Sequence, residues 1–415
     1  RSPGLPVSFS EQCRGSAPII SEPFGSQCAM SEHAVPFHLP EIGEEEIRAV
    51  TETLRSGWLT TGQRTKQFEQ EFAQAVHATH AVATNSGTAA LHLALEAVGV
   101  KEGDEVILPT MTFAATAEVV SYLRAKPVLV DSEPDTLNLD PDAVRQAITP
   151  RTKVIMPVHF AGHPCAMDRL LSVATEYELK VVEDAAHALP AADHGRMVGA
   201  IGDITCFSFY ATKSITTGEG GMATTHHAHY AERMRSMSLH GITKDAWSRY
   251  AGTGSWYYEI REPGFKYNLT DIAASIGIEQ LRKSRRFWTA RARIAAAYHD
   301  AFSELPEIQR PLCRPGYDHA WHLYVIQLNP ERLRITRDDF IEALKKEQIG
   351  TSVHFMPLHM HPYYRERYGY HRDDFPHARA AFERSISLPI YSRMSEADIR
   401  RVVDVVRSLI TQYRR

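Results

Sequence analysis

The stretch that decides the fold is EVILPTMTFAATAEVVSYLRAKPVLVD, residues 105–131. It begins with a short apolar run, EVILP (105–109), and ends with another, KPVLVD (126–131). Between the two runs, ATAEVVSYL (115–123) has the apolar spacing of a helix. Short apolar runs joined by a helix are typical of parallel strands that are buried on both faces. The stretch therefore predicts a strand–helix–strand unit within a parallel sheet.

The same alternation continues on both sides of this unit. Upstream, AVAT (81–84) predicts a strand, and apolar residues at helical spacing over 91–98 predict the helix that follows it. Three more apolar runs predict strands downstream: KVIMPVHF (153–160), KVVEDAA (180–186) and ITCFSFY (204–210). Buried strands that alternate with helices indicate the α/β class, with a mostly parallel sheet covered on both faces.

Two helices are predicted before the first strand. Apolar residues over 47–54 recur at helical spacing, and Gly57 follows them as a C-terminal stop. Apolar residues over 68–76 mark the second helix, with Thr65 as its cap. These helices extend the pattern towards the N-terminus.

The C-terminal third has a different pattern. RRFWTARARIAAAYHDAF (285–302) predicts a helix that begins the crossing into a second region. Beyond it, HAWHLYVIQL (319–328) and GTSVHF (350–355) predict strands. Helices are predicted at 337–346 and 396–411. This mixture indicates a smaller α+β domain.

Three parts are therefore predicted along the chain. Residues 1–33 are a leader or an extension, because the first 29 residues are rich in Pro, Gly and Ser and show no periodicity. Residues 34–285 form the large domain that holds the parallel sheet. Residues 286–415 form the small C-terminal domain.

The composition narrows the class of protein. The 415 residues are 43% hydrophobic and 23% charged, as in an ordinary globular protein, and the formal net charge of −4 gives no reason to expect nucleic acid as a partner. No apolar run approaches the ~18 residues of a membrane span, and the start lacks the pattern of a secretory signal. Five cysteines without a CxxC pair suit a reducing cytoplasm, and the 21 histidines show no metal-ligand spacing.

The first motif with chemical meaning is NSGT (85–88), which lies between a predicted strand and a predicted helix. A turn with glycine at a helix N-terminus offers unpaired N–H groups and the positive end of the helix dipole, which suit a phosphate. The alternative is an ordinary Ser or Thr cap of the helix.

Two further motifs place an acid and a lysine at strand ends. VVEDAAH is an apolar strand that ends in Glu183 and Asp184. Ligands of open α/β sheets bind beyond the carboxyl ends of strands, which favours a chemical role for Asp184 over a simple cap; Glu183 is expected to be a solvated or packing neighbour. In FSFYATK (207–213) another strand delivers Lys213 just before TGEGG (217–221). A lone lysine in a loop is nearly always a solvated charge, but these neighbours favour a function.

Together these motifs resemble those of the DegT/StrS family of nucleotide-sugar aminotransferases, which depend on pyridoxal phosphate (PLP). The resemblance runs from about residue 34 to the C-terminus. It is carried by GWLTTG (57–62), NSGTAALHLAL (85–95), PTMTFAAT (109–116), VVEDAAHA (181–188), FSFYATK…TGEGG (207–221) and PGFKYNLTDI (263–272). It implies the aspartate-aminotransferase-like fold (fold type I), with a large PLP-binding domain and a smaller C-terminal domain.

The resemblance implies a role for each matching residue. Lys213 would bind PLP as a Schiff base and then move the proton, and Asp184 would hold the pyridine nitrogen protonated so that the ring acts as an electron sink. Phe113 matches an aromatic residue that stacks on the ring, unless it is a core residue. His187 matches a position near the phenolic oxygen. Phosphate contacts are implied for Gly87, Thr88, Ser208 and, towards the cofactor of the neighbouring subunit, Asn268.

For the substrate, the resemblance implies Thr60, Thr61, Tyr210 and His354 near the sugar, although each suits packing equally well. PGFKYNLTDI and VHFMPLH (353–359) are similar to members that act on UDP-linked 4-keto sugars, such as UDP-4-amino-4-deoxy-L-arabinose aminotransferase. The implied reaction moves an amino group from L-glutamate to a keto sugar nucleotide, for a surface polysaccharide, lipopolysaccharide or glycosylated metabolite. The nucleotide, the sugar and amination at position 3 or 4 stay open.

The implied enzyme is a homodimer with shared active sites, and Trp256, Tyr257 and Tyr258 suit its interface. Two alternatives are a PLP-dependent sugar dehydratase on the same fold and a non-catalytic sensor or scaffold. A histidine replaces the lysine in those dehydratases, so Lys213 argues against the first alternative. Lys213 and Asp184 together argue against the second.

Overall fold

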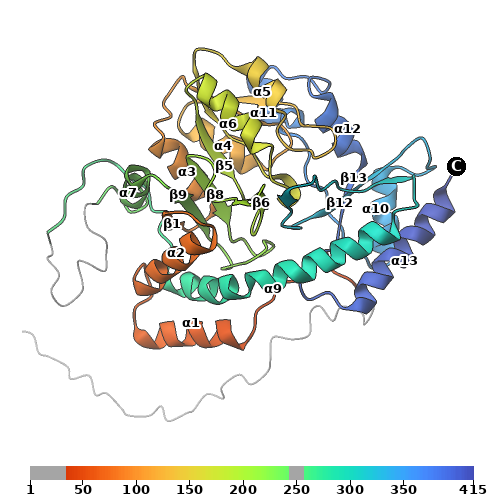
Figure 1. Cartoon of the computed structure of the whole chain (residues 1–415), viewed down its shortest axis with the longest axis horizontal. Helices are drawn as coiled ribbons and strands as arrows, with labels where there is room; N and C mark the ends of the chain where they lie inside the picture. The colour runs from red at the N-terminus through yellow and green to blue at the C-terminus, as the bar shows by residue number, and fades with distance from the viewer. Residues whose placement is uncertain (1–33, 243–256) are drawn as a thin grey trace, which may run out of the picture. The chain divides into compact units, whose positions relative to one another are not determined.

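The central feature of the fold is a seven-stranded sheet. The computed structural model describes residues 34–242 and 257–415, and residues 35–415 form one compact unit (Figure 1). The strand order is β1-β9-β8-β5-β4-β2-β3, and within this sheet only β9 runs antiparallel to its neighbours. The predicted α/β class with a mostly parallel sheet is confirmed. The strands are β1 (His80–Thr84), β2 (Glu105–Pro109), β3 (Lys126–Val130), β4 (Thr152–Ile155), β5 (Lys180–Asp184), β8 (Ile204–Ser208) and β9 (Gly221–Thr225).

Helices cover both faces of this sheet. Helices α3, α4 and α7 pack on one face. On the other face, α5 and α6 cover the β2-β4-β5 side, and α2 and α9 cover the β1-β9-β8 side. The bounds are α1 (Glu44–Ser56), α2 (Gln63–Ala75), α3 (Gly87–Ala97), α4 (Ala114–Tyr122), α5 (Pro141–Ala147), α6 (Met167–Glu176), α7 (Ala228–Met237) and α9 (Asp271–Ala301).

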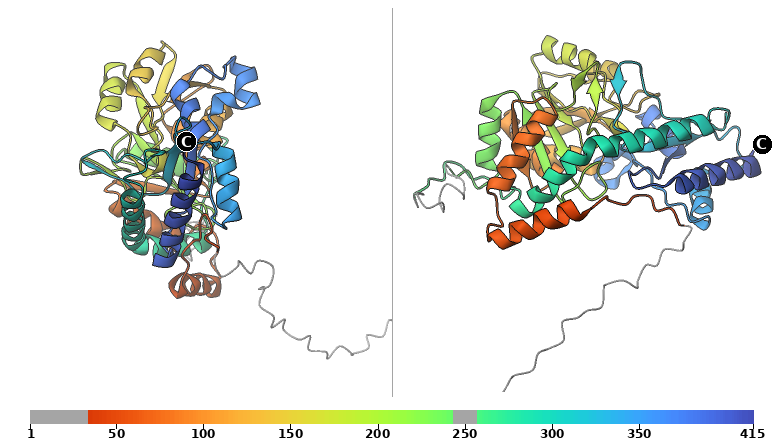
Figure 2. Two further views of the ribbon diagram at one scale, coloured as in Figure 1. Left: turned by 90° about the vertical axis from the view of Figure 1, so that its right-hand side faces the viewer. Right: turned by 60° about the horizontal axis from the view of Figure 1, so that its bottom comes forward.

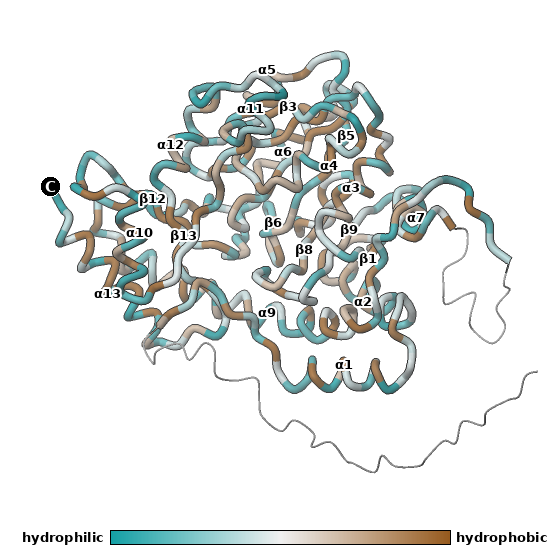
Figure 3. Tube along the Cα trace, turned by 180° about the vertical axis from the view of Figure 1, so that it is seen from behind, coloured by the Kyte–Doolittle hydropathy of each residue, from teal (hydrophilic) through white to brown (hydrophobic). Residues whose placement is uncertain are grey.

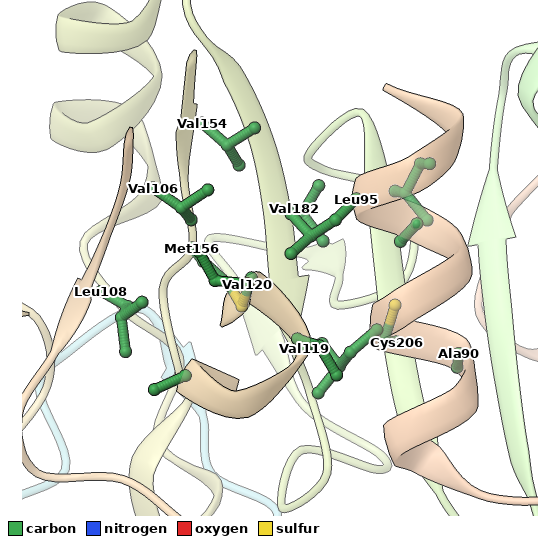
Figure 4. Close-up of a cluster of buried hydrophobic side chains, with 14 of the residues drawn as sticks. Ala90, Leu95, Val106, Leu108, Val119, Val120, Val154, Met156, Val182 and Cys206 are labelled. Carbon is green, nitrogen blue, oxygen red and sulfur yellow. The ribbon is translucent and has the colours of Figure 1, made fainter. Parts of the chain in front are cut away.

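Successive residues along each strand point to opposite faces of the sheet, so they form two hydrophobic layers. Val106, Val154 and Val182 belong to the cluster that also holds Leu95 and Val119 of the covering helices (Figure 4). Their strand neighbours turn to the opposite layer and pack against α5 and α6: Ile107, Ile155 and Val181. Strands that are buried on both faces need continuous apolar runs, which is why the sequence showed runs instead of alternation.

A second, antiparallel sheet lies in the C-terminal part, with order β10-β12-β13. Its core also takes residues from α9, α10 and α13. A third small sheet, β11-β6-β7, completes the described strands. The bounds are β6 (Ala192–Asp193), β7 (Arg196–Met197), β10 (Ile308–Gln309), β11 (Tyr317–Asp318), β12 (Tyr324–Leu328), β13 (Ser385–Leu388), α10 (Arg337–Lys346), α11 (Pro362–Tyr368), α12 (Pro376–Arg384) and α13 (Glu396–Tyr413).

Helix α9 belongs to both hydrophobic cores. It has 31 residues, begins after the N-cap Thr270 and contacts α1 near its start and α13 near its end (Figure 2). Ala274 and Ile278 pack in the core under the seven-stranded sheet, whereas Ile294 and Tyr298 pack in the core of the three-stranded sheet. The predicted boundary at residue 285 therefore falls within one continuous helix. The division into a large and a small domain stays a prediction.

The strand predicted at 350–355 is wrong. Only Ser352 pairs there, in an isolated bridge with Ser387 of β13, and β13 itself occupies the place beside β12. The backbone N–H of Phe355 donates to Sδ of Met111 at 3.4 Å, so the stretch leaves the sheet and runs to the cavity described below. Other predicted strands are shorter than expected, and the largest differences are at β4, which ends at Ile155, and at β12, which begins at Tyr324.

The two N-terminal helices form as predicted, and Gly57 ends the first of them, but the predicted cap of the second is wrong. The N-cap of α2 is Gly62, and Thr65 instead donates its hydroxyl to Asp271 at 2.7 Å. In α1, Gly57 ends the helix in the left-handed region, with φ 74°. The apolar face of α1 points outward, because Ile47 and Leu54 are 51% and 52% exposed. Within the described ranges, no helix combines the length and the apolar character needed to cross a membrane.

Candidate active site

A cavity of about 510 Å³ lies where the carboxyl ends of β5 and β8 meet the N-terminus of α3. Parallel strands end at one edge of a sheet, so motifs far apart in the sequence converge there. Nine of the predicted site residues line this cavity: Gly87, Thr88, Phe113, Asp184, His187, Ser208, Tyr210, Lys213 and His354.

The N-terminus of α3 forms an anion cradle in the cavity wall. Ser86 caps the helix and accepts a hydrogen bond from the Ala89 N–H at 3.0 Å, so the predicted capping alternative is confirmed. Gly87 and Thr88 begin the helix, where backbone N–H groups have no partner within the helix. A Cβ on Gly87 would lie 2.9 Å from Cβ of Ser208, so only glycine fits against β8 here. The cradle suits a phosphate, as the NSGT motif predicts.

Asp184 is the last residue of β5 and is 6% exposed. Its Oδ1 accepts from the Ala186 N–H at 3.1 Å, and its Oδ2 accepts from the Thr116 hydroxyl at 2.9 Å. Burial raises the pKa of Asp184, and these hydrogen bonds and the charge of Lys213 oppose that rise. The arrangement suits a carboxylate that holds a protonated ring nitrogen.

Glu183 is buried on the opposite side of β5 and does not line the cavity. It accepts hydrogen bonds from Nε2 of His159 at 2.9 Å, from the Thr205 hydroxyl at 2.6 Å and from the Gly202 N–H at 2.7 Å. Although burial raises the pKa of Glu183, these donors outweigh it and hold that pKa below its ordinary value. Glu183 is therefore a packing neighbour, and the solvated alternative is wrong.

Lys213 lies in the loop between β8 and β9 and lines the cavity with Asp184. Burial lowers the pKa of its amine to about 8, and the charge of Asp184 only partly offsets that effect. About one-tenth of the amine is therefore neutral at pH 7, far more than for a lysine with the ordinary pKa. A neutral lysine amine is the nucleophile that condenses with an aldehyde.

Four histidines stand around this lysine, and two of them were not predicted. Predicted His187 is buried, and its Nδ1 has no partner within the described ranges. His322 packs against it, with ring centroids 4.4 Å apart, and also has an unpartnered Nδ1. Burial and the charge of Lys213 hold the pKa of His187 well below its ordinary value, so the imidazole is neutral. Unpartnered buried nitrogens at a cavity indicate a ligand that completes them. The cavity histidines are His38, His187, His322 and His354.

Asn268, Thr60 and Thr61 do not line the cavity of their own chain. The Asn268 amide donates to the Thr61 hydroxyl at 2.7 Å, and its oxygen accepts from Nζ of Lys266 at 2.6 Å. Thr270, and not Asn268, caps α9.

The predicted interface residues fall partly within the described chain. Trp256 lies outside the described residues, whereas Tyr257 and Tyr258 are exposed. Two side chains that reach the cavity, His38 and His322, carried no signal in the sequence. His38 lies in no predicted element, and His322 lies inside the strand predicted at 319–328, away from its carboxyl end. The structure brings them there from the segment before α1 and the segment before β12.

Comparison with known proteins identifies this architecture. The model of the DegT/DnrJ/EryC1/StrS aminotransferase family matches residues 40–407. The chain belongs to this family. SpsC of Bacillus subtilis, a spore coat polysaccharide biosynthesis protein, is 49% identical over 91% of this chain and 97% of SpsC. An uncharacterised protein of Methanocaldococcus jannaschii, MJ1066, is 51% identical over 92% of this chain and 99% of its own length.

Solved structures of the DegT/DnrJ/EryC1/StrS family share the fold. The pyridoxamine-phosphate form of Spr1654 from Streptococcus pneumoniae, named as a sugar aminotransferase, has a TM-score of 0.86 at 36% identity and covers 91% of this chain and 99% of its own. Its PLP form has a TM-score of 0.84. The predicted cofactor and the predicted fold are confirmed at the level of the family. The cradle at Gly87, the buried Asp184 and the buried Lys213 amine with its lowered pKa fit PLP in this chain.

Proposed function

We propose that this chain transfers the amino group of L-glutamate to a keto sugar carried by a nucleotide, with a 4-keto sugar favoured. The observation that carries the proposal is the presence of Lys213 and Asp184 in one cavity beside the α3 N-terminus. The names of two relatives support a sugar pathway: SpsC belongs to polysaccharide biosynthesis, and PseC of Helicobacter pylori to pseudoaminic acid biosynthesis. The product would serve a surface polysaccharide, lipopolysaccharide or glycosylated metabolite, and the enzyme would work in the cytoplasm.

Each residue of the cavity has a separate proposed role. PLP, when bound, supplies an electron sink for the carbanion that forms as a proton leaves the substrate. Lys213 would hold the cofactor through Nζ, then take and return the substrate proton at the same atom. Asp184 would keep the ring nitrogen protonated. Neutral His187 would donate a hydrogen bond from Nδ1 to the phenolic oxygen of the cofactor. Gly87 and Thr88 would bind the phosphate with Ser208.

Aromatic residues at the cavity support a ring-shaped acceptor. Phe113 and Tyr210 both line it, although they are 61% and 46% exposed. Exposed aromatic side chains at a binding site offer faces for stacking on a cofactor or a sugar ring. His354 lines the same cavity and packs edge to face with Phe355.

Acceptor profiling tests the proposed function. Holoenzyme with L-glutamate is expected to aminate at least one sugar in a panel of 3-keto and 4-keto sugars linked to UDP, GDP or dTDP, and to release one 2-oxoglutarate for each amino sugar. Mass spectrometry of the products measures both. Loss of a sugar oxygen without use of glutamate would favour the dehydratase alternative. Failure with every nucleotide-linked sugar would refute the proposal.

We also propose a homodimer in which Asn268 completes the phosphate site of the neighbouring subunit. Asn268 is held beside Lys266 and Thr61 outside its own cavity, and only one of the two N–H donors of its amide is used on Thr61. The second donor would bind the phosphate in the neighbouring subunit. The outward apolar face of α1, with Ile47 and Leu54, would otherwise leave large side chains in water. Figure 3 shows hydrophobic positions recurring along α1. A two-fold axis makes such an exchange reciprocal.

Mixing two inactive variants tests the shared site. Lys213→Ala removes the amine, and Asn268→Asp places a negative charge against the neighbouring phosphate. Mixed dimers then contain one site with both residues intact, so we expect up to about half of the wild-type activity per mixed dimer. Native mass spectrometry confirms that mixed dimers form, and each variant mixed with itself is the control. Mixed dimers that form and stay inactive would refute the shared site, as would full activity of a monomer.

A further inference from the structure

A hydrogen-bonded network of three side chains lies at the base of the cavity: Thr112, Thr116 and Asp184. Oγ1 of Thr116 lies 2.9 Å from Oδ2 of Asp184, and Oγ1 of Thr112 lies 2.7 Å from Oγ1 of Thr116. All three are buried, with exposed fractions of 2%, 0% and 6% in chain order. Thr112 and Asp184 line the cavity, whereas Thr116 stands behind it on the first turn of α4.

The number of hydroxyl hydrogens determines which group donates in each of these hydrogen bonds. An ionised carboxylate can only accept, so the single hydroxyl hydrogen of Thr116 points to Asp184. Thr116 must then accept from Thr112, whose hydroxyl hydrogen is the one left for the 2.7 Å contact. Each hydroxyl therefore has one orientation. Consecutive hydrogen bonds in such a network polarise and strengthen one another.

We propose that Thr116, supported by Thr112, is a positioning residue that keeps Asp184 ionised and fixed towards the ring nitrogen of the cofactor. The inference rests on the proposed role of Asp184. Oδ1 of Asp184 has the Ala186 N–H as donor, and Oδ2 has the Thr116 hydroxyl. A carboxylate with one donor on each oxygen cannot rotate freely, and in a buried site each donor favours its charged form.

Other threonines of the protein show that the hydrogen bond made by the Thr116 hydroxyl is not the one that helical threonines usually make. A helical threonine commonly returns its hydroxyl to the carbonyl four residues earlier. Five threonines do so here: Thr51, Thr53, Thr175, Thr289 and Thr411. Thr65, at the third position of α2 as Thr116 is in α4, instead donates to buried Asp271 at 2.7 Å. Thr65 lies outside the cavity and provides a matched control for a hydroxyl–aspartate bond.

The test uses holoenzyme reconstituted with PLP that carries ¹⁵N at the ring nitrogen, whose chemical shift reports protonation of that nitrogen. Thr116→Val removes the hydroxyl and keeps the shape of the side chain. We expect the ¹⁵N shift at neutral pH to move towards that of an unprotonated ring nitrogen, because losing a donor raises the proton affinity of Asp184 by about one to two pH units and draws the shared proton from the ring to the carboxylate. Thr116→Ser should restore the wild-type titration. Turnover of Thr116→Val should fall about tenfold, with little change in KM.

Controls separate positioning from simple packing. Thr65→Val is expected to lower the melting temperature and to leave the ¹⁵N titration unchanged. If Thr116→Val does not fold, Thr112→Val tests the same hydrogen-bonded network, because it removes the donor to Thr116. It should move the ¹⁵N titration in the same direction as Thr116→Val, but by less. An unchanged titration in the folded Thr116 or Thr112 variant would overturn the inference.

Asp184→Asn distinguishes this inference from the role of Asp184 itself. If Asp184→Asn moves the ¹⁵N titration and Thr116→Val does not, only the positioning role fails. If Asp184→Asn leaves the titration unchanged, Asp184 does not address the ring nitrogen, and the proposed role of that carboxylate fails as well.

Discussion

Replacement of Lys213 by alanine is expected to reduce transamination by at least about 10⁴-fold, while the purified variant still binds PLP non-covalently. Among the described residues that line the cavity, Lys213 is the only lysine, and its amine is partly neutral because its pKa is lowered to about 8. Both the covalent attachment and the proton transfer would be lost together. Single-turnover kinetics with L-glutamate measure the loss, and the phosphate cradle at Gly87 and Thr88 explains the retained binding.

Chemical labelling identifies the same residue independently. Borohydride reduction of the wild-type holoenzyme followed by peptide mapping should place the cofactor on Lys213. Lys153→Ala is the matched control, because Lys153 is exposed on β4 and the substitution is identical. This control should keep wild-type activity. A label on another lysine, or substantial turnover by Lys213→Ala, would contradict the assignment.

Asp184→Asn is expected to cost roughly 10²–10³-fold in turnover, the range found when one preorganised electrostatic contact is removed. The adjacent Glu183→Gln should stay within a few-fold of wild type at saturating PLP. The two side chains leave β5 on opposite faces, and only Asp184 lines the cavity. Asparagine keeps the size of the side chain but removes the charge that, in the proposed role, would hold the ring nitrogen protonated.

Glu183→Gln should instead lower stability, because Glu183 accepts from His159, Thr205 and Gly202 in a buried network. One buried partner left unsatisfied costs about 1–3 kcal/mol of the free energy of unfolding. Steady-state kinetics and urea unfolding of both variants separate the two effects. Equal turnover of Asp184→Asn and Glu183→Gln would mean that the wrong acid has been assigned.

The sheet was predictable because its signal is local. Each buried parallel strand must be an apolar run, as in EVILP (105–109), and β2 has the predicted bounds. The cavity was predictable for a related reason, since parallel strands carry their C-terminal motifs to one edge. Asp184 and Lys213 meet there although 29 positions separate them in the sequence.

What escaped prediction depends on contacts between distant segments. His38 and His322 reach the cavity because of how the segments before α1 and β12 pack, which no local pattern records. GTSVHF has the composition of a strand, yet β13 takes the place beside β12. The helical spacing of Ile47 and Leu54 predicted a helix correctly but could not tell whether its apolar face meets the core or another chain.

The continuity of α9 has a consequence for how the protein unfolds. Its first half is held by the core with Ile278 and its second half by the core with Ile294, so neither core can lose its packing without releasing a segment of the same helix. No exposed linker separates the halves within Asp271–Ala301. We therefore expect the two cores to unfold together in one transition, whereas a chain with a flexible connection would melt in two stages. A cut at residue 285 would leave two fragments that each lack part of their own core.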